Sequence, residues 1–469
     1  MVGNGVQESR EERAQRGRAM RREVPFAALG ELDSTTETDV VALLEQQAVG
    51  RVPELVPVRY GRMLVSPFTF YRGAALLMAA DLAQGPRTAL TVQLCGDAHL
   101  SNFGLFASPE RRLVFDVNDF DETNPGPFEW DVKRLAASVE IAGRDNAHSA
   151  KQRRAAVTAT VRAYRLAIRE LADQTNLAVW YSHRAVDPAT PGLRALRSKR
   201  SRRSLRDSVA RAYGRDSMAA QRKLTERVDG RLRIVNNPPV VVPVRELDLA
   251  QMGLDVDLDL DGWMEGLLDS YVRTLQPDRR HLVEQYRVVD VAHKVVGVGS
   301  VGARAWIVLL VGADDEDPLF LQAKEAQASV LEGYTGASRY RNHGRRVVEG
   351  QRLIQAYGDI LLGWHTTKFA KVPADYYVRQ LRDWKGSAEV ADLDPAGLAF
   401  YGELCATTLA RAHARSGDRV AIGAYVGRKD GFEQAVADFA AAYADKNQRD
   451  YATLEAACSA GVVTATTGV

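Results

Sequence analysis

One stretch, from Leu94 to Asp131, constrains the fold more than any other because it sets polar groups at the ends of two apolar runs. It reads LCGDAHLSNFGLFASPERRLVFDVNDFDETNPGPFEWD. The runs before Gly96 and before Asp119 predict two buried strands, and the glycine permits a sharp turn. Asp97 follows that turn, and Asn102 stands five residues later. We expect these side chains to meet in loops at strand ends, where rigid scaffolds display catalytic groups.

This set of polar groups suits phosphoryl transfer. That chemistry uses one carboxylate to accept a proton from the attacking hydroxyl, and it uses a carboxamide and a second carboxylate to hold the Mg²⁺ ions that bridge the nucleotide phosphates. The alternative is structural, since Asp and Asn are common turn formers and the pattern D-x-x-x-x-N alone indicates only a turn.

The segment GDAHLSN, from Gly96 to Asn102, resembles the G-D-x-H-x-x-N catalytic loop of the aminoglycoside phosphotransferase and choline kinase branch of the protein-kinase-like superfamily. That branch follows a metal-binding Asp-Phe with a Gly seven residues on and an Asp twelve residues on. The chain has Asp119-Phe120 and then Gly126 and Asp131 at those distances. The amino-acid sequence around this segment, with YRGAA before it and NDFDE after it, also resembles the bacterial domain of unknown function 2252 family, and this resemblance extends over most of the chain.

The resemblance assigns roles to individual residues. It implies that Asp97 is the catalytic base, that Asn102 and Asp119 are Mg²⁺ ligands, and that Asp131 is a buried buttress of the loop. One position departs from the branch, because Cys95 stands where a scaffolding His is usual.

A second informative stretch, residues 295–326, reads VVGVGSVGARAWIVLLVGADDEDPLFLQAKEA. Gly297, Gly299 and Gly302 form G-x-G-x-x-G between strand-like runs, and a further strand ends in Lys324. A dinucleotide-binding turn must open a helix, whereas β-rich residues follow here. The pattern instead resembles the kinase nucleotide lobe, in which a glycine-rich hairpin covers the phosphates and the next strand carries a Lys. On this resemblance, the hairpin of this chain would bind the phosphates with its three glycines and Ser300. Arg304 and Gln322 depart from the usual residues of that lobe.

The kinase lobe also needs a helical Glu that pairs with the Lys. Glu349 lies on a predicted helix before the strand ILLGWHT, which is the expected place, and Glu332 is the rival. The segment YYVRQLRDWKGS then predicts the strand and hinge where an adenine would lie. Arg59, Arg62 and Arg72 are interpreted either as phosphate contacts or as structural arginines.

The motif order is inverted relative to kinases, because the catalytic loop precedes the glycine-rich loop. Circular permutation would explain this, since compact domains tolerate such rearrangement; coincidence of the second motif set is the alternative. The predicted fold class is therefore α+β, with a protein-kinase-like two-lobed architecture in permuted order. The predicted units are a disordered tail (1–24), the catalytic-loop part of the helical lobe (25–193), a basic helical insertion with connecting helices (194–285), the nucleotide lobe (286–387) and C-terminal helices (388–469).

Charge and composition limit the partners. The net charge of +2, from 62 basic and 60 acidic residues, creates no global field for nucleic acid. No apolar run near 18 residues predicts a membrane span, and the charged N-terminus does not have the pattern of a signal peptide. We therefore expect a cytoplasmic protein without zinc or disulfides. The basic segment 194–223 leaves open an acidic partner, with a solvated basic face as the alternative.

These observations predict an ATP- and Mg²⁺-dependent phosphotransferase that acts on a hydroxyl of a small molecule. Its site would comprise Asp97 as base, Asn102 and Asp119 on Mg²⁺, and Lys324 held by Glu349. Two other functions remain open. One is kinase-like nucleotidyl transfer to protein (AMPylation), and the other is a non-catalytic nucleotide-binding regulator.

Overall fold

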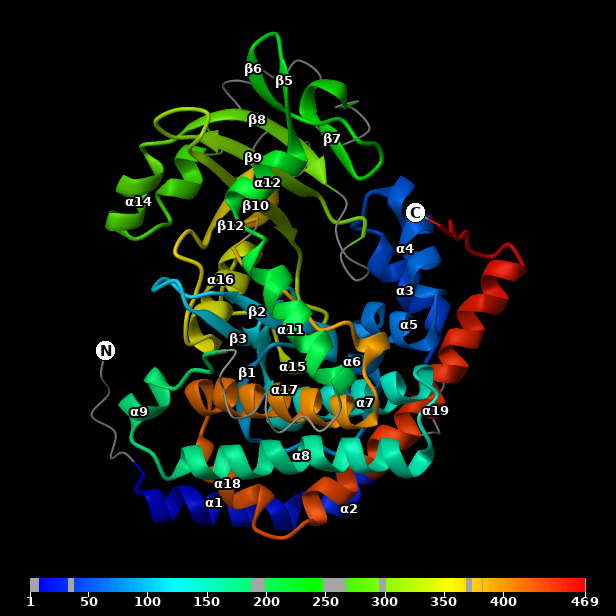
Figure 1. The fold of residues 1–469 in the computed structure, drawn as a ribbon. Helices are drawn as coiled ribbons and strands as arrows, with labels where there is room; N and C mark the ends of the chain where they lie inside the picture. The colour runs from blue at the N-terminus through cyan, green and yellow to red at the C-terminus, as the bar shows by residue number, and fades with distance from the viewer. Residues whose placement is uncertain are drawn as a thin grey trace.

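The computed structural model describes residues 8–32, 38–186, 199–247, 266, 268–294, 301–367, 373–381 and 383–468. Helices and antiparallel strands occupy largely separate parts of the molecule, so the fold class is α+β. Figure 1 shows a six-stranded sheet in the upper part and long helices stacked in layers below it.

The six-stranded sheet has the order β11-β12-β10-β9-β8-β7, and the neighbours pair antiparallel. Its strands are β7 (Val241–Pro243), β8 (Arg287–Lys294), β9 (Ala305–Val311), β10 (Pro318–Ala326), β11 (Gly363–Thr367) and β12 (Ala374–Gln380). In β9 and β10 Leu310 faces Leu319, and Ala305 faces Lys324. The strand that ends with the Lys324 segment therefore pairs with the strand-like run that follows the glycines.

Both faces of this sheet are covered, because side chains alternate between faces along a strand. Ile307 and Leu309 of β9 pack in one cluster with Leu224 and Leu232, whereas Leu310 packs in another with Val283. The covering elements are α12 (Ser217–Leu224), the hairpin of β5 (Thr225–Val228) and β6 (Arg231–Ile234), α14 (Pro277–Val283) and α16 (His343–Ile354).

The helical part is built around two long helices, α8 (Ala150–Ala172) and α17 (Pro395–Ser416), which make the most extensive helix contact. A capping box between Ser149 and Gln152 starts α8, and Asp394 followed by Pro395 starts α17. The remaining helices of this part are α1 (Arg10–Glu23), α2 (Phe26–Gly30), α3 (Val40–Ala48), α4 (Val56–Met63), α5 (Pro67–Gly73), α6 (Ala75–Gln84), α7 (Phe128–Asp145), α9 (Asn176–Tyr181), α18 (Arg419–Val426) and α19 (Gly431–Ser459).

Two small antiparallel ladders lie between the helices and the sheet. They are β1 (Thr91–Leu94) with β4 (Asn124–Pro127), and β2 (Phe103–Ala107) with β3 (Leu113–Val117). Leu94, Phe103 and Val117 are buried in the main core, which also takes in Val347 and Ile354 of α16. This shared core fixes the sheet part on the helical part. The remaining described elements are α11 (Lys199–Tyr213), α15 (Glu332–Thr335) and the 3₁₀ turns Pro53–Leu55, Leu100–Asn102, Val244–Glu246 and Val390–Asp392.

The expectation of a disordered tail over residues 1–24 differs from the structure. Residues 10–23 form α1, which a capping box at Ser9 and Glu12 starts and which packs against α18. Asp418 accepts hydrogen bonds from Arg13 at 2.6 Å and from Arg16 at 2.5 Å. Contacts with a helix distant in sequence therefore outweigh the polar composition that predicted disorder.

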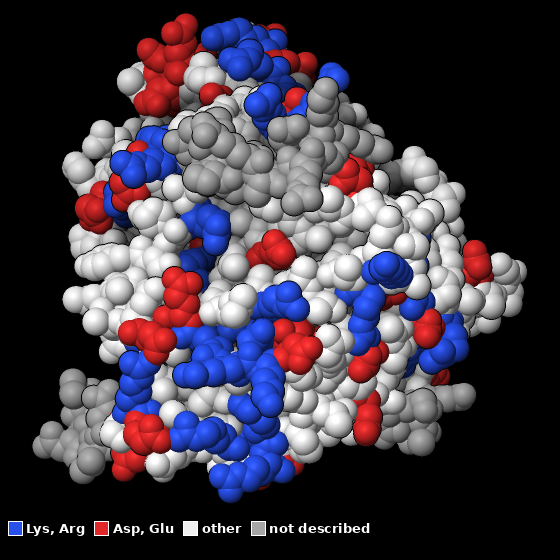
Figure 2. Space-filling view, turned by 60° about the horizontal axis from the view of Figure 1, so that its bottom comes forward, with Lys and Arg blue, Asp and Glu red and all other residues white. Residues whose placement is uncertain are grey.

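Lys and Arg side chains gather on the lower part of the face drawn in Figure 2, where α1, α8 and α18 lie. Burial lowers the pKa of Arg169, and the charges of Arg428 and Arg165 lower it further, as expected for crowded arginines. The predicted docking segment is a different one. Within 194–223, residues 194–198 lie outside the described part of the chain, and the remainder forms α11 and α12.

Candidate functional site

The turn after β1 has the geometry that the sequence predicts. Gly96 has φ +85°, and a Cβ there would lie 2.1 Å from the carbonyl oxygen of Glu122, so only glycine fits. The buried carboxylate of Asp131 accepts the backbone N–H of Cys95 at 2.8 Å and of Gly96 at 3.1 Å. Nε2 of His413, from α17, lies 3.2 Å from the same carboxylate. Asp131 therefore holds the turn, as its predicted role as a buttress requires.

Asp97 lies just beyond this turn and faces α7. Arg134 of α7 donates a hydrogen bond from Nε to its carboxylate at 2.8 Å and forms an ion pair with it, with Nη2 at 2.7 Å, and His99 Nε2 lies 3.6 Å away. Burial raises the pKa of Asp97 to about 6, because it outweighs the favourable charge of Arg134, and the negative charge of Asp119 raises it further. The group is an ionised, partly shielded carboxylate at neutral pH.

The two predicted metal ligands lie at the open end of the β2–β3 hairpin, Asn102 just before β2 and Asp119 just after β3. The amide nitrogen of Asn102 donates to the carbonyl of Asp97 at 2.8 Å, which leaves the amide oxygen outside that bond. The backbone N–H of Asn118 donates to the carbonyl of Asn102 at 3.0 Å and so brings Asp119 beside the catalytic loop. Burial raises the pKa of Asp119, and the charge of Asp121 adds to the effect.

The segment that carries Asp119, Asp121 and Glu122 is called the acidic loop below. Lys324 reaches this loop from the sheet. It lies on β10 opposite Tyr377 of β12, and it is 4% exposed. Its Nζ donates to one carboxylate oxygen of Asp121, and the Tyr377 hydroxyl donates to the other at 2.8 Å. Burial opposes the charge of Lys324, but Asp121 and then Asp119 more than offset it, so the pKa of Lys324 is raised. Segments 203 residues apart thus meet at one ion pair.

The predicted partner of Lys324 is wrong. Glu349 does lie on a helix, α16, but its carboxylate is 3.8 Å from Arg345 and 3.9 Å from Arg352 on the outer side of that helix. The rival Glu332 instead lies 3.7 Å from Nε of Arg346 and accepts backbone N–H groups of its own loop. Asp121 therefore occupies the position that the sequence assigns to a helical glutamate.

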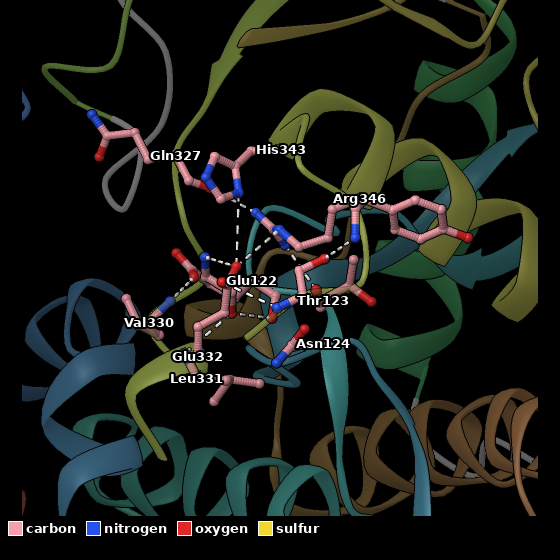
Figure 3. Close-up of polar contacts among 12 residues, drawn as sticks. Glu122, Thr123, Asn124, Gln327, Val330, Leu331, Glu332, His343 and Arg346 are labelled. Atoms are coloured by element: carbon pink, nitrogen blue, oxygen red, sulfur yellow. Dashed lines mark hydrogen bonds and ion pairs between the residues drawn. The ribbon is translucent and has the colours of Figure 1, made fainter. Parts of the chain in front are cut away.

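Arg346 is the residue of α16 that turns toward the acidic loop, as Figure 3 shows. Its guanidinium donates to the carbonyl of Thr123 at 2.7 Å and to the carbonyls of Asp121 and Gln327 at 2.8 Å each. Beside it, the carboxylate of Glu122 accepts the N–H of Val330 at 2.7 Å. Sequence reasoning missed Arg346, because an arginine on an amphipathic helix ordinarily indicates a solvated side chain.

Of the glycine-rich stretch, only its end can be placed. Gly297, Gly299 and Ser300 lie outside the described residues. Gly302 has φ +88°, and its carbonyl accepts the N–H of Val52 at 2.8 Å. Arg51 donates to the carbonyl of Val301 at 2.5 Å. The segment before α4 therefore anchors the glycine-rich stretch, a contact with no signal in the sequence.

A cavity of about 490 Å³ opens beside this anchor and the Lys324–Asp121 pair. Its polar lining includes Arg51, Asp121, Glu122 and Glu325, and the Nε of Arg51 has no hydrogen-bond partner among the described residues. The volume is within the usual range of small-molecule sites. A second cavity, of about 480 Å³, is mainly apolar and lies between α8 and α17.

Cationic side chains surround the acidic loop on its other sides. Arg379 of β12 donates to the carbonyl of Asn118 at 3.2 Å, and burial followed by the charge of Arg379 lowers the pKa of Lys385 to about 7. Burial lowers the pKa of Arg72, while the charges of Asp97 and Asp119 act in the opposite direction, which places this arginine near both carboxylates. Other predicted phosphate contacts differ. Arg59 is fully buried and donates to Gln47 and to the carbonyl of Gly73. Three carboxylates of the acidic loop, those of Asp119, Asp121 and Glu122, thus lie among several basic side chains.

Comparison with known proteins places the chain in a family. The model of uncharacterized proteins conserved in bacteria, domain of unknown function 2252, matches residues 51–457. The chain belongs to this family. The match begins at Arg51, so it includes the anchor of the glycine-rich stretch and every predicted site residue. Neither a curated protein nor a solved structure matches the chain. Among the described helices, none is both long and apolar enough to cross a membrane.

Proposed function

We propose that this protein is a kinase-like phosphotransferase that uses ATP and Mg²⁺ and acts on a hydroxyl of a small molecule. The observation that carries the proposal is the contact between Lys324 and Asp121. Asp121 stands two residues after Asp119, so the strand lysine of one motif set meets the acidic loop of the other. A coincidental glycine-rich hairpin would have no reason to present its lysine there.

The order of elements in the sheet supports the same function. A kinase nucleotide lobe runs from a glycine-rich hairpin to a strand carrying the phosphate-binding Lys and then to a helix. Here β8, β9 and β10 are successive antiparallel strands, Lys324 lies on the third, and α16 follows and packs on the sheet. Circular permutation accounts for the catalytic loop preceding this unit in the chain.

Within this proposal, Asp97 accepts the proton of the acceptor hydroxyl. A carboxylate with a pKa of about 6 is ionised at neutral pH and still basic enough to take a proton. Arg134 fixes the orientation of that carboxylate through a hydrogen bond and an ion pair. Lys324 and Arg72 supply positive charge for phosphate groups, because both lie beside the carboxylates.

Asn102 and Asp119 fit a shared Mg²⁺ site. Mg²⁺ takes oxygen ligands and usually binds one or two protein carboxylates together with substrate phosphates. Among the residues that the structure describes, no group of three or more His, Cys, Asp or Glu side chains is arranged to hold a metal alone. One amide oxygen and one carboxylate with a raised pKa are donors that a cation would stabilise in company with phosphate. When bound, the ion would neutralise charge on the transferred phosphoryl group.

Thermal unfolding with and without ATP and Mg²⁺ tests nucleotide binding, because a ligand of the native state raises the melting temperature. We expect a shift for the wild type, a loss of its Mg²⁺ dependence in Asn102→Ala and Asp119→Ala, and no change in the control Asp438→Asn, whose carboxylate is 62% exposed. Absence of any shift at millimolar nucleotide with Mg²⁺ or Mn²⁺ would overturn the proposal.

Labelled ATP then distinguishes the reactions. Transfer of the γ-phosphate to a metabolite supports phosphoryl transfer, whereas transfer of the α-phosphate to protein supports nucleotidyl transfer. Binding without transfer supports a regulator. Asp97→Asn should retain nucleotide affinity and lose roughly 10²-fold or more in turnover, as expected for a positioned general base.

A further inference from the structure

The contacts of Lys324 define how it is held. Its amine is buried and hydrogen-bonded to Asp121, and the Tyr377 hydroxyl fixes the second oxygen of the same carboxylate. A buried ammonium needs such a partner, because an unpaired charge in the interior is costly.

In a kinase nucleotide lobe, a helical glutamate is the partner of the lysine. Here the corresponding helix, α16, contacts the acidic loop through an arginine instead. Arg346 of α16 donates three hydrogen bonds to backbone carbonyls, and two of these carbonyls belong to Asp121 and Thr123. Close approach is possible because Gly350 faces the loop, where a Cβ would lie 2.5 Å from the Thr123 side chain. The helix is therefore joined to the backbone of the acidic loop, and the carboxylate of that loop is joined to the lysine.

We propose that Asp121 is the positioning residue for Lys324, in place of the helical glutamate, and that Arg346 sets the position of Asp121 relative to α16. The inference rests on the proposed function for its consequence, since the purpose of a held lysine is to meet nucleotide phosphates. Asp119 and Asp121 belong to one short segment, so a single loop positions both the proposed metal ligand and the lysine. Arg346 thereby ties α16 to both.

A double-mutant cycle in the absence of nucleotide tests the pairing. Asp121→Asn leaves a buried ammonium and Lys324→Met leaves a buried carboxylate, so we expect both to lower the melting temperature. The double variant should lose clearly less than the sum of the two, because coupled partners are non-additive. Glu349→Gln, a carboxylate on the outer side of α16, is the matched control and should be additive with Lys324→Met. Additivity for Asp121 together with coupling for Glu349 would overturn the inference.

Tyr377→Phe provides a milder variant if Asp121→Asn does not fold, because it removes only the hydroxyl that holds Asp121. It should weaken the coupling measured between positions 121 and 324 while retaining the core packing of the ring. An unchanged coupling would show that Tyr377 does not orient the carboxylate and would remove that part of the inference.

Nucleotide affinity tests the consequence. Asp121→Asn and Arg346→Lys should each weaken binding of Mg²⁺-ATP about tenfold. Asparagine removes the charge that holds Lys324, and the lysine ammonium cannot reproduce the planar fork by which the guanidinium reaches three carbonyls. Glu349→Gln should bind like the wild type. If wild-type protein binds nucleotide and Glu349→Gln alone is impaired, the inference fails and the proposed function stands. If the wild type does not bind nucleotide, the proposed function fails, and the stability cycle still decides the pairing.

Discussion

At the scale of residues, the site is a set of partly buried carboxylates. Burial raises the pKa of Asp97 to about 6, and it raises the pKa of Glu122 to about 7. Asp121 behaves in the opposite way, because it has Lys324 as a direct partner. The differing environments set one carboxylate aside as an ion-pair partner and leave others poised to take up a proton near neutral pH.

Glu122 gives a prediction about stability and pH. Its pKa is raised from 4.5 to about 7, so between these values the folded protein binds a proton that the unfolded chain has released. Stability therefore falls as pH rises through this interval. Glu122→Gln cannot ionise and keeps an oxygen for the Val330 N–H, so its stability relative to the wild type should increase by about 1–3 kcal/mol from pH 5 to pH 8. Denaturant unfolding at both pH values measures the difference, and a constant difference would refute the prediction.

The polar residues of the turn after β1 were predictable because they follow one another closely in the chain. Gly96, Asp97 and Asp131 take the predicted places because a strand, a turn and a following helix fix them within a few dozen residues. Arg346 was not predictable, since its three carbonyl partners come from two other segments. Glu349 has the expected residue type and lies on the expected helix, but the sequence does not state which side of the helix meets the loop.

At the scale of elements, the apolar runs around the glycine-rich stretch predicted strands of the sheet, and helical periodicity is visible in the long helices. The apolar runs of β9 and β10 pair as expected, with Leu310 opposite Leu319. Helix α8 buries Val157, Val161 and Ile168, which recur at helical spacing. The prediction failed for α1, where composition indicated disorder and tertiary contacts stabilise a helix.

The approach of α16 to the acidic loop gives a prediction at this scale. Ala is favoured over Gly inside a helix by about 1 kcal/mol, yet Gly350→Ala should lower the melting temperature because its Cβ would meet Thr123 at 2.5 Å. The matched control is Gly333→Ala, on helix α15, where a Cβ would meet nothing within 4 Å. Differential scanning calorimetry of the two variants decides the matter. A Gly350→Ala protein as stable as Gly333→Ala would show that α16 has room to withdraw from the loop.

At the scale of the whole molecule, parts distant in sequence depend on one another for their placement. The sheet contributes Lys324, and helix α16 contributes Arg346, to a loop more than two hundred residues earlier. In the other direction, Arg51 and Val52 fix the end of the glycine-rich stretch. The order of motifs along the chain therefore says little about their proximity, and only the chemical need of one set for the other indicated that they meet.

The N-terminal helix shows the same dependence between distant parts and gives the last prediction. Helix α1 lies across α18, with Gly17 so close that a Cβ would be 2.1 Å from the carbonyl of Ala421. Arg13 and Arg16 neutralise Asp418, which also caps α18. Removal of residues 1–24 exposes this surface and leaves Asp418 without its two arginines, so we expect the melting temperature to fall by several degrees.

Arg10→Ala is the control for this truncation, because the Arg10–Asp173 pair is 60% and 75% exposed and such pairs contribute little. Its melting temperature should stay close to that of the wild type. Limited trypsin digestion gives an independent measure, since a docked α1 protects its arginines from cleavage whereas a disordered tail is cut first. A truncated protein with the wild-type melting temperature, together with rapid cleavage within residues 10–23, would restore the interpretation of this segment as a tail. Protection and a lowered melting temperature would establish α1 as part of the folded unit that carries the site.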